Sequence, residues 1–331
     1  MTTTGAMKKN APRKRAGTRR RQSLTAEKWS LRRAGELQIL RAPELAALDW
    51  LVHGFSTRPG GASRLETFRD GRKAGEKVLN LGFTEWDTGA DVLDNRQMFF
   101  AAVGANKMRV VALRQIHSDI VHRVGPVEDM GSREAAPEVP LQGDALCTGL
   151  RGVLLAVQTA DCVPILLADT KQRAVAAIHA GWRGTLRRIA AKTLGRMQME
   201  LGTRPEDVIA ALGPGIGQRC YEVGADVAKE FQPQFPNARD WFEGPFDALA
   251  SGEDDPNWLP WLTMRPPGHA APAPRVRLDL IAANRAILAG AGVRAENIVS
   301  SGFCTACRTD LFFSYRRERT TGRMMAVIGI R

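Results

Sequence analysis

The chain has 331 residues, of which 44% are hydrophobic and 25% charged, and its formal net charge at pH 7 is +12. This apolar share is ordinary for a folded protein and the length suits one large domain or two average ones, so wholesale disorder is excluded. No apolar run reaches the ~18 residues of a membrane-spanning helix and no secretory signal is found, which favours a cytoplasmic protein without a membrane partner. Five cysteines, an odd number, do not make a disulfide framework.

The excess positive charge is concentrated near the N-terminus. Residues 1–21 contain eight Lys and Arg side chains and no acid, whereas the other 310 residues hold 39 basic and 35 acidic side chains. A basic segment with so few apolar residues repels itself and stays solvated, so residues 1–37 are expected to form a disordered tail. Weak nucleic-acid binding through this tail, or organelle targeting, is the less favoured alternative.

Ordered structure is expected from Gln38 onward, beginning with a strand, a helical turn and a second strand over residues 38–58. Short apolar runs then predict buried strands, and longer 3.6-residue patterns predict helices. The predicted strands are 108–117, 152–162, 173–181 and Val208–Leu212, and the predicted helices are 88–104, 185–201 and 278–292.

Residues 232–275 differ from the rest of the chain. They hold nine of the 18 prolines and three of the seven tryptophans, a composition typical of a long irregular insertion. The remaining pattern predicts a single catalytic domain over residues 38–331. Its expected fold class is α+β, with packed mixed β-sheets flanked by helices.

Three potential metal ligands lie at the ends of predicted strands: His117, Cys162 and His179. A His–Cys–His set with an open fourth position is typical of catalytic zinc, which can polarise a substrate or activate water. Their separations are too long for a zinc-finger clip, so their convergence depends on the fold. From spacing alone, ordinary core packing of each residue stays the alternative.

The other histidines are weaker candidates. His122 follows His117 by five residues, which places the two on opposite faces of an extended chain. His53 lies beside a turn, where a pocket role and a structural role are equally expected. His269 lies in the insertion and is expected to be exposed to solvent.

One CxxC motif is formed by Cys304 and Cys307. A single CxxC is a weak signal for a redox site or a structural metal, since a four-cysteine zinc site needs a second pair. The remaining candidates, Cys147 and Cys220, are far apart in the sequence.

Four turns have the composition of ligand-binding loops. They are HGFSTRPGGAS with Arg58, HAGWRGT with Arg183, LGPGIGQRCYEVG, and FFSYRR with Arg316 after an aromatic strand. Arginines and backbone N–H groups beside open turns favour an anionic or phosphate-bearing substrate. Taken singly, each turn is more often structural, and none matches a P-loop or the GxGxxG spacing.

The motifs HGFSTRPGGAS, QIHSDIV, GDALCT, TADCVPILLAD, AAIHAGWRGT, ALGPGIGQRCYEVG and FFSYRR–TGR occur in this order over residues 51–331. Together they resemble the family named multicopper polyphenol oxidoreductase (laccase), peptidoglycan editing factor, and purine nucleoside phosphorylase with adenosine deaminase activity. The resemblance implies a layered fold like that of Cys/His hydrolases and one zinc ion held by His117, Cys162 and His179. It also implies phosphorolysis of adenosine, inosine and methylthioadenosine, and deamination of adenosine, with a purine nucleoside and phosphate as ligands.

Further site roles follow from this reading. Cys162 and His179 are expected to act in catalysis, and Asp161 is expected to carry a proton or, preferably, to brace the neighbouring ligand. The candidate contacts to phosphate or ribose are Arg58, Arg183, Arg316 and His53.

Two other functions stay open at this point. Cys162 could be a nucleophile paired with His179 in a hydrolase that edits a peptidoglycan precursor, and the tail could belong to a nucleic-acid-binding protein. A true multicopper laccase is excluded because its copper centres are built mainly from imidazole and the chain has five histidines. Copper is expected only as an adventitious substitute for zinc in the same site.

Overall fold

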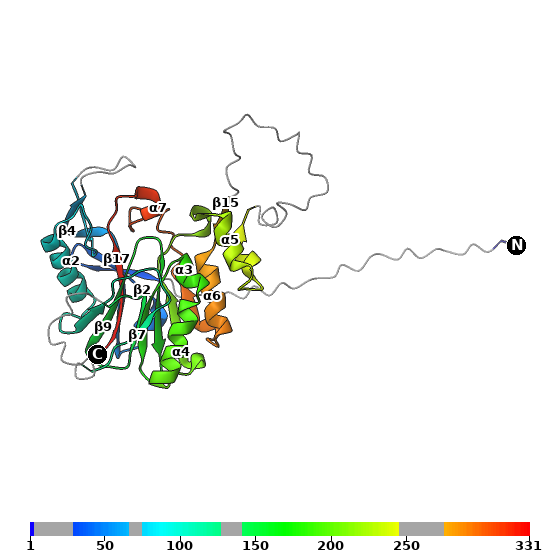
Figure 1. Cartoon of the computed structure of the whole chain (residues 1–331), viewed down its shortest axis with the longest axis horizontal. Helices are drawn as coiled ribbons and strands as arrows, with labels where there is room; N and C mark the ends of the chain where they lie inside the picture. The colour runs from blue at the N-terminus through cyan, green and yellow to red at the C-terminus, as the bar shows by residue number, and fades with distance from the viewer. Residues whose placement is uncertain (3–28, 66–74, 127–140, 245–274) are drawn as a thin grey trace, which may run out of the picture.

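The computed structural model describes residues 1–2, 29–65, 75–126, 141–244 and 275–331. Two six-stranded mixed sheets pack face to face and helices cover their outer faces, so the molecule has four layers (Figure 1). The predicted α+β class, with packed mixed sheets flanked by helices, is confirmed. Within the described ranges, no helix combines the length and the apolarity needed to cross a membrane.

The first sheet is built around the strand β17. In spatial order its strands are β1 (Ser30–Ala34), β2 (Leu37–Arg41), β3 (Leu51–Ser56), β17 (Met324–Ile330), β9 (Val153–Thr159) and β6 (Arg109–Ala112). β17 pairs antiparallel with β3 and with β9, whereas β6 pairs parallel with β9. Because both faces of this sheet are covered, β9 and β17 are apolar along almost their whole length.

The second sheet positions the site. In spatial order its strands are β16 (Ile298–Ser300), β12 (Val208–Leu212), β10 (Val163–Asp169), β11 (Val175–Ala180), β8 (Ala145–Thr148) and β7 (Val121–Arg123). The antiparallel pairing of β10 with β11 sets Val163 opposite Ala180. This register brings Cys162, which precedes β10, next to Gly181, which follows β11.

The buried side chains form separate layers between the sheets and between each sheet and its helices. Along β9, Leu155 faces the second sheet, whereas Leu154 faces the opposite side, where α2 packs. Along β10, Leu166 faces the first sheet and Ile165 faces the helices beyond. This strict alternation follows from the two-residue period of a strand and explains why these runs contain so few polar residues.

The helices form the two outer layers. They are α1 (Pro43–Ala46), α2 (Gly89–Ala102), α3 (Trp182–Leu186), α4 (Ile189–Leu201), α5 (Ala225–Phe231), α6 (Leu280–Gly290) and α7 (Tyr315–Glu318). The predicted helix over 88–104 is α2, whose N-cap Thr88 accepts a hydrogen bond from Asp91 N–H. The predicted helix over 185–201 is instead two helices, because Arg188 adopts a left-handed conformation with φ +59° between them.

Two smaller sheets complete the described structure: β4 (Pro59–Leu65) with β5 (Glu76–Val78), and β13 (Glu222–Gly224) with β15 (Arg275–Leu278) and β14 (Phe242–Glu243). The predicted aromatic strand in FFSYRR is wrong. Ser314 accepts a hydrogen bond from Arg317 N–H and thereby caps the short helix α7 in this segment.

The predicted domain start at Gln38 is also wrong. β1 begins at Ser30 and pairs with β2, and the Trp29 ring lies 5.3 Å from the Phe55 ring. The strand escaped prediction because its exposed sequence SLRRA carries no apolar alternation. The basic residues before it lie outside the described residues.

The first part of the predicted insertion belongs to the core. Phe235, Trp241 and Phe242 are buried, and their rings lie 5.8, 6.2 and 5.5 Å from the ring of Phe231. An irregular segment starting at residue 232 is therefore wrong for residues 232–244, since this aromatic cluster holds them against the domain. Residues 245–274 of the insertion, His269 included, lie outside the described residues, and Arg275 begins β15.

Candidate functional site

His117, Cys162 and His179 converge as predicted. Their ligand atoms all lie within 4.8 Å of one another, and the two imidazole rings are 4.9 Å apart at an interplanar angle of 76°. His179 belongs to β11 and Cys162 lies between β9 and β10. His117 follows β6 in an irregular segment and adopts φ +57°, so the predicted strand over 108–117 ends early, at Ala112.

A glycine makes room for this convergence. A Cβ added at Gly181 would lie 2.9 Å from Cys162 Sγ and 3.2 Å from His117 Cδ2. Contacts under 3.0 Å are essentially absent between real atoms of this kind, so any side chain here would push the ligands apart.

Asp144 holds the two histidines in place. This fully buried carboxylate accepts hydrogen bonds from His179 Nδ1 at 2.8 Å and from the backbone N–H groups of His117 and Ser118 at 3.1 and 2.6 Å. Its contact with Nδ1 leaves His179 Nε2 available to a ligand. Asp144 is not among the site residues predicted from the sequence, although its position in GDALCT, immediately before the buried strand β8, is a usable signal.

The electrostatics favour charged forms at these donors. Burial alone would raise the pKa of the Cys162 thiol, but the charge and hydrogen bonds of His179 and His117 outweigh burial and lower that pKa to about 6. Burial would lower the pKa of His179, yet Cys162 and Asp144 raise it to about 9. Without a metal, both the thiolate and the imidazolium are therefore populated at neutral pH, as in a Cys/His nucleophile. A metal ion would bind the thiolate and the neutral imidazole, with release of the imidazolium proton.

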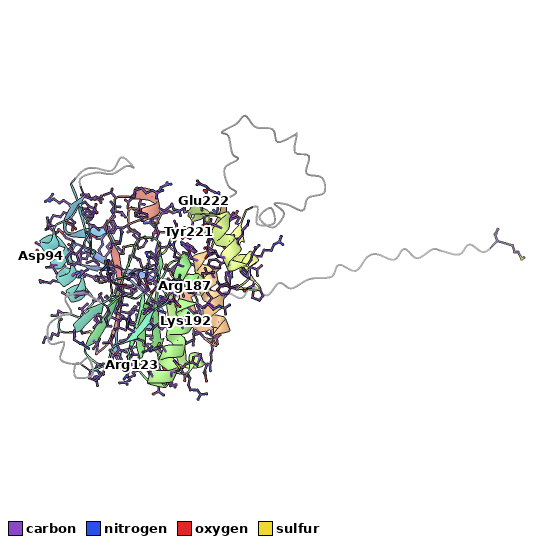
Figure 2. All side chains as sticks on the ribbon, in the orientation of Figure 1. Asp94, Arg123, Arg187, Lys192, Tyr221 and Glu222 are labelled. Carbon is purple, nitrogen blue, oxygen red and sulfur yellow. The ribbon has the colours of Figure 1, made fainter. Side chains whose placement is uncertain are left out.

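The donors lie in a cavity of about 800 Å³. Its lining includes the aromatic residues Phe83, Trp182, Tyr221 and Tyr315 and the basic residues Arg114, Arg183, Arg316, Arg319 and Arg323. Among the described residues of the lining, Asp161 is the one carboxylate. Tyr221 and Glu222 lie toward the end of the molecule at which α7 and β15 are found (Figure 2).

Three of these arginines stack on aromatic rings. The Arg183 guanidinium lies 4.4 Å from the Trp182 ring centre, and that of Arg316 lies 5.1 Å from the centre of Tyr221. A third pair, Arg319 and Tyr315, is separated by 5.8 Å. Stacked guanidinium planes are well suited to hold phosphate or carboxylate groups, and the exposed ring of Tyr315 can accept a flat aromatic ligand.

Asp161 is bound on both of its carboxylate oxygens. Thr305 Oγ1 donates to Oδ1 and Arg316 N–H donates to Oδ2, both at 2.6 Å. The residue also adopts φ +91°, a conformation unfavourable for a side chain that bears a Cβ. The geometry ties the segment with Cys162 to the segment with Arg316.

Arg58 and His53 lie away from the cavity. Arg58 is 1% exposed, forms an ion pair with Glu318 and lies 5.0 Å from the Phe313 ring centre, so it fixes the chain that leads into α7. His53 is fully buried in β3 and accepts a hydrogen bond from Ala42 N–H through Nε2. Neither lines the cavity, so direct contact with phosphate or ribose is no longer expected of either.

The remaining histidine described by the structure is separate from the donors. His122 lies in β7, where its Nε2 is 2.8 Å from Gln142 O, and it is absent from the His117 cluster, as its spacing predicted. The cysteines behave differently, because Cys220 lies beside Cys304 and Cys307 despite its distance in the sequence.

The donor chemistry fits a zinc ion. Two imidazoles and one thiolate are ordinary zinc ligands, and their spacing suits bonds of about 2.0–2.3 Å to a shared centre. The hydrogen bond between a ligand imidazole and a buried carboxylate is also the usual support of a metal-binding histidine.

Comparisons with known proteins point to one family. The family model described as multi-copper polyphenol oxidoreductase laccase matches residues 52–331. A purine nucleoside phosphorylase of Deinococcus radiodurans is 40% identical over 296 residues, which cover 89% of this chain and 93% of that protein. The adenosine deaminase RL5 of an unknown prokaryotic organism is 36% identical over 286 residues, covering 83% and 94%.

A solved structure extends the likeness to the fold. The crystal structure of YlmD from Geobacillus stearothermophilus matches with a TM-score of 0.69 at 32% identity, over 91% of this chain and 98% of that one. With the motifs, the layered fold and the matched residues in agreement, the chain belongs to the multi-copper polyphenol oxidoreductase laccase family.

Proposed function

We propose that the protein is a zinc-dependent purine nucleoside enzyme, which cleaves adenosine, inosine and methylthioadenosine with phosphate and deaminates adenosine. The observation that carries the proposal is one cavity that combines five arginines, four aromatic side chains and the His117–Cys162–His179 set. The names of the Deinococcus and RL5 relatives support it. A cytoplasmic location belongs to the proposal, since all five cysteines are free thiols, which suits a reducing compartment.

The cavity residues can bind the two substrates separately. Arg183 and Arg316 would hold phosphate through paired N–H donors, and Tyr315, which is exposed, would stack against the purine. Binding both at once would orient a phosphate oxygen toward ribose C1′ while the purine departs.

Proton handling follows from burial. Burial raises the pKa of Tyr221, so its hydroxyl stays protonated and can donate a hydrogen bond to the departing purine. Asp161 would act as a brace and not as a proton carrier, because both of its oxygens already accept hydrogen bonds from Thr305 and Arg316. His117, Cys162 and His179 would hold the zinc ion, which when bound supplies a Lewis acid for the activation of water.

The donor count argues against laccase chemistry. Of the described histidines, His117 and His179 are the two that line the cavity, and His53 and His122 lie elsewhere. Several copper centres built mainly from imidazole cannot be assembled from two rings. Copper would therefore enter only as a substitute for zinc.

A second candidate is favoured by one specific observation. Cys162, His179 and Asp144 form a thiolate, an imidazolium and an orienting carboxylate, the order of groups in a Cys/His nucleophile. In this reading the protein is a hydrolase that edits a peptidoglycan precursor through an acyl-enzyme on Cys162.

A nucleoside panel tests the main proposal. Adenosine, inosine and methylthioadenosine would be incubated with and without phosphate, with released base and ammonia measured separately. Phosphate-dependent base release and phosphate-independent ammonia release are expected, and the zinc ion at His117, Cys162 and His179 should be lost in Cys162→Ser. A zinc-free enzyme that accumulates a covalent adduct on Cys162 with a peptide substrate would replace this proposal by the second candidate.

A matched pair of arginine variants sharpens the assignment. Arg183→Met removes a cavity cation and should raise the phosphate KM roughly 10- to 100-fold, the cost of lost charge-assisted hydrogen bonds. Arg187, which is exposed on the same stretch of chain but outside the cavity lining, serves as the control (Figure 2). Arg187→Met should leave this KM within about twofold; equal effects of the two variants would contradict the phosphate role of Arg183.

A further inference from the structure

A second group of soft donors lies outside the cavity. Cys220, Cys304 and Cys307 bring their Sγ atoms within 4.8 Å of one another, and the sulfurs of Cys220 and Cys307 are 3.4 Å apart. None of the three lines the cavity, and Cys307 is exposed to solvent. We infer that this cysteine cluster binds one thiophilic d¹⁰ cation, Zn²⁺ or Cu⁺, as a structural clamp.

The sulfur spacing fits a shared metal ion. Bonds of about 2.3 Å to a zinc ion would separate thiolate sulfurs by about 3.8 Å in a tetrahedral site. The observed separations, 3.4 Å for one pair and at most 4.8 Å for all, bracket this value. A disulfide between Cys220 and Cys307 would use two of the three sulfurs and would leave the position of Cys304 unexplained.

The backbone around Cys304 favours the thiolate form. Gly217 N–H donates a hydrogen bond to its Sγ at 3.1 Å. Although burial raises the pKa of the Cys304 thiol, backbone N–H groups, Gly217 first among them, outweigh this effect and lower it. The turn from Cys304 to Arg308 is closed by a bond from Arg308 N–H to Cys304 O at 3.0 Å, which keeps Cys307 on the same side as Cys304.

The cluster joins a segment that lines the cavity, through Tyr221, to a segment that supports a lining residue, through Thr305. Cys220 is followed by Tyr221, and Cys304 is followed by Thr305, which donates to Asp161. The two segments already meet at a bridge between Gly215 and Cys304 and through the bond from Thr305 N–H to Gly215 O at 3.0 Å. A bound ion would add a link between them that does not touch the substrate.

The described His, Cys, Asp and Glu side chains supply three donors at this cluster and no fourth. A Cu⁺ ion would be satisfied by three thiolates, whereas Zn²⁺ would take a fourth ligand from solvent on the exposed side of Cys307. The chemistry therefore selects soft cations and rejects Mg²⁺ and Ca²⁺, which require oxygen ligands.

Metal counting on the full chain tests the inference. The purified reduced protein would be stripped and reloaded with Zn²⁺ in one arm and with Cu⁺ under a reducing atmosphere in the other, then analysed by elemental mass spectrometry. Two ions per chain are expected in at least one arm, one ion in Cys162→Ser or in Cys307→Ser, and none in the double variant. One ion in the wild type that is lost in Cys162→Ser and kept in Cys307→Ser, or two that persist in Cys307→Ser and Cys220→Ser, would overturn the second site.

Thiol protection gives a readout that needs no substitution. Metal addition should slow alkylation of Cys220, Cys304 and Cys307 about tenfold or more, measured by peptide mass spectrometry, whereas Mg²⁺ should leave it unchanged. A Cys220–Cys307 disulfide in the reduced preparation, seen as a loss of two hydrogens without a second ion, also contradicts the inference. Neither measurement uses nucleoside turnover, so failure here is distinguishable from failure of the proposed function.

Discussion

The two cysteine-containing clusters of this protein differ in how they are supported. At His117, Cys162 and His179, a fully buried carboxylate, a glycine and two adjoining strands of one sheet all hold the donors in place. At Cys220, Cys304 and Cys307, two loop segments meet near the surface, and backbone N–H groups such as that of Gly217 bond to the Cys304 sulfur. The first cluster is preorganised by the core, whereas the second is positioned mainly by its own loops.

The difference in support suits the two clusters to different functions, although both offer similar metal ligands. A rigid, deep set of donors with an open position suits catalysis, because its geometry does not change when a substrate arrives. A shallow three-sulfur set suits a clamp, because a bound ion would link two loop segments without contacting a substrate. The first cluster should therefore tolerate local changes poorly, and the second should tolerate them better.

Two glycines give the strongest test of this difference. In Gly181→Ala the new Cβ would lie 2.9 Å from Cys162 Sγ, and in Gly217→Ala it would lie 3.3 Å from Cys304 Sγ. We expect Gly181→Ala to lose its zinc ion and to reduce nucleoside turnover by about 100-fold or more. Gly217→Ala should keep turnover within about threefold, because a half-buried loop near the surface can shift by a few tenths of an ångström. If metal content and turnover fell equally in both variants, the proposed difference in rigidity between the two clusters would be wrong.

The buried carboxylate provides the next largest effect. Asp144→Asn keeps the size of the side chain but removes the charge that supports His179 and one acceptor for the backbone of His117 and Ser118. Zinc affinity at the first cluster should fall about 10- to 100-fold, as for other lost partners of ligand histidines. Affinity at the cysteine cluster should not change, and competition with a chelating dye measures both. An unchanged zinc affinity at the first cluster would show that Asp144 is only a packing residue.

Thiol acidity distinguishes the clusters in the metal-free protein. The pKa of Cys162 is lowered to about 6, whereas burial and the sulfur of Cys307 raise the pKa of Cys220 to about 12. Above pH 6 Cys162 becomes thiolate, while Cys220 stays a thiol through the whole neutral range. At pH 7.5 Cys162 should therefore react with iodoacetamide about tenfold or more faster, after allowance for the weaker nucleophilicity of an acidic thiol. A Cys162 rate that rises only near pH 9 would contradict the thiolate–imidazolium pair.

The smallest expected effect concerns His53, a buried histidine outside both clusters. Burial and Arg41 lower its pKa from 6.5 to about 3, so between these values the unfolded chain binds a proton that the folded chain does not. Stability is therefore lost as pH falls from 6.5 toward 3, by about 1.4 kcal/mol per pH unit within this window. His53→Gln keeps an acceptor for Ala42 N–H and should flatten this slope, measured by urea unfolding between pH 6 and 4.5. An unchanged slope would assign the acid sensitivity to other groups.

Asp144 stays ionised over the pH range used to test His53. The pKa of Asp144 is lowered to about 2, because the hydrogen bonds from His179 and Ser118 outweigh the effect of burial. Its contribution to stability is present above about pH 4 and is lost only as pH falls toward 2. Unfolding data above pH 4.5 therefore report on His53 without protonation of Asp144.

Sequence patterns predicted the elements with strong periodicity and the donors at their ends. The apolar runs that became β9, β11 and β12, and the capped helix α2, have signals contained within a few residues. His117, Cys162 and His179 were identified by their places at strand ends and by their motifs. Arg183 and Arg316 line the cavity, as expected of a site beside these turns.

The missed features depend on residues distant in the chain. From the sequence Arg58 was predicted to bind the substrate. In the structure it forms a buried ion pair with Glu318, which is 260 residues away in the chain. Cys220 joins Cys307 across 87 residues, and Asp144 meets His179 across 35. These pairings are determined by how the sheets and loops pack. They leave no local periodic pattern in the sequence, so they could not be predicted from a single sequence.

The central place of β17 has a consequence for biosynthesis. β3 pairs with β17 through contacts such as Phe55 with Ala326, so this half of the first sheet joins residues separated by about 270 positions. During synthesis on the ribosome, β3 emerges long before β17 is made. The edge of β3 that pairs with β17 therefore stays unpaired until the end of translation. Non-local pairing of this kind slows folding, and it makes the nascent chain a candidate client for chaperones that shield exposed strand edges.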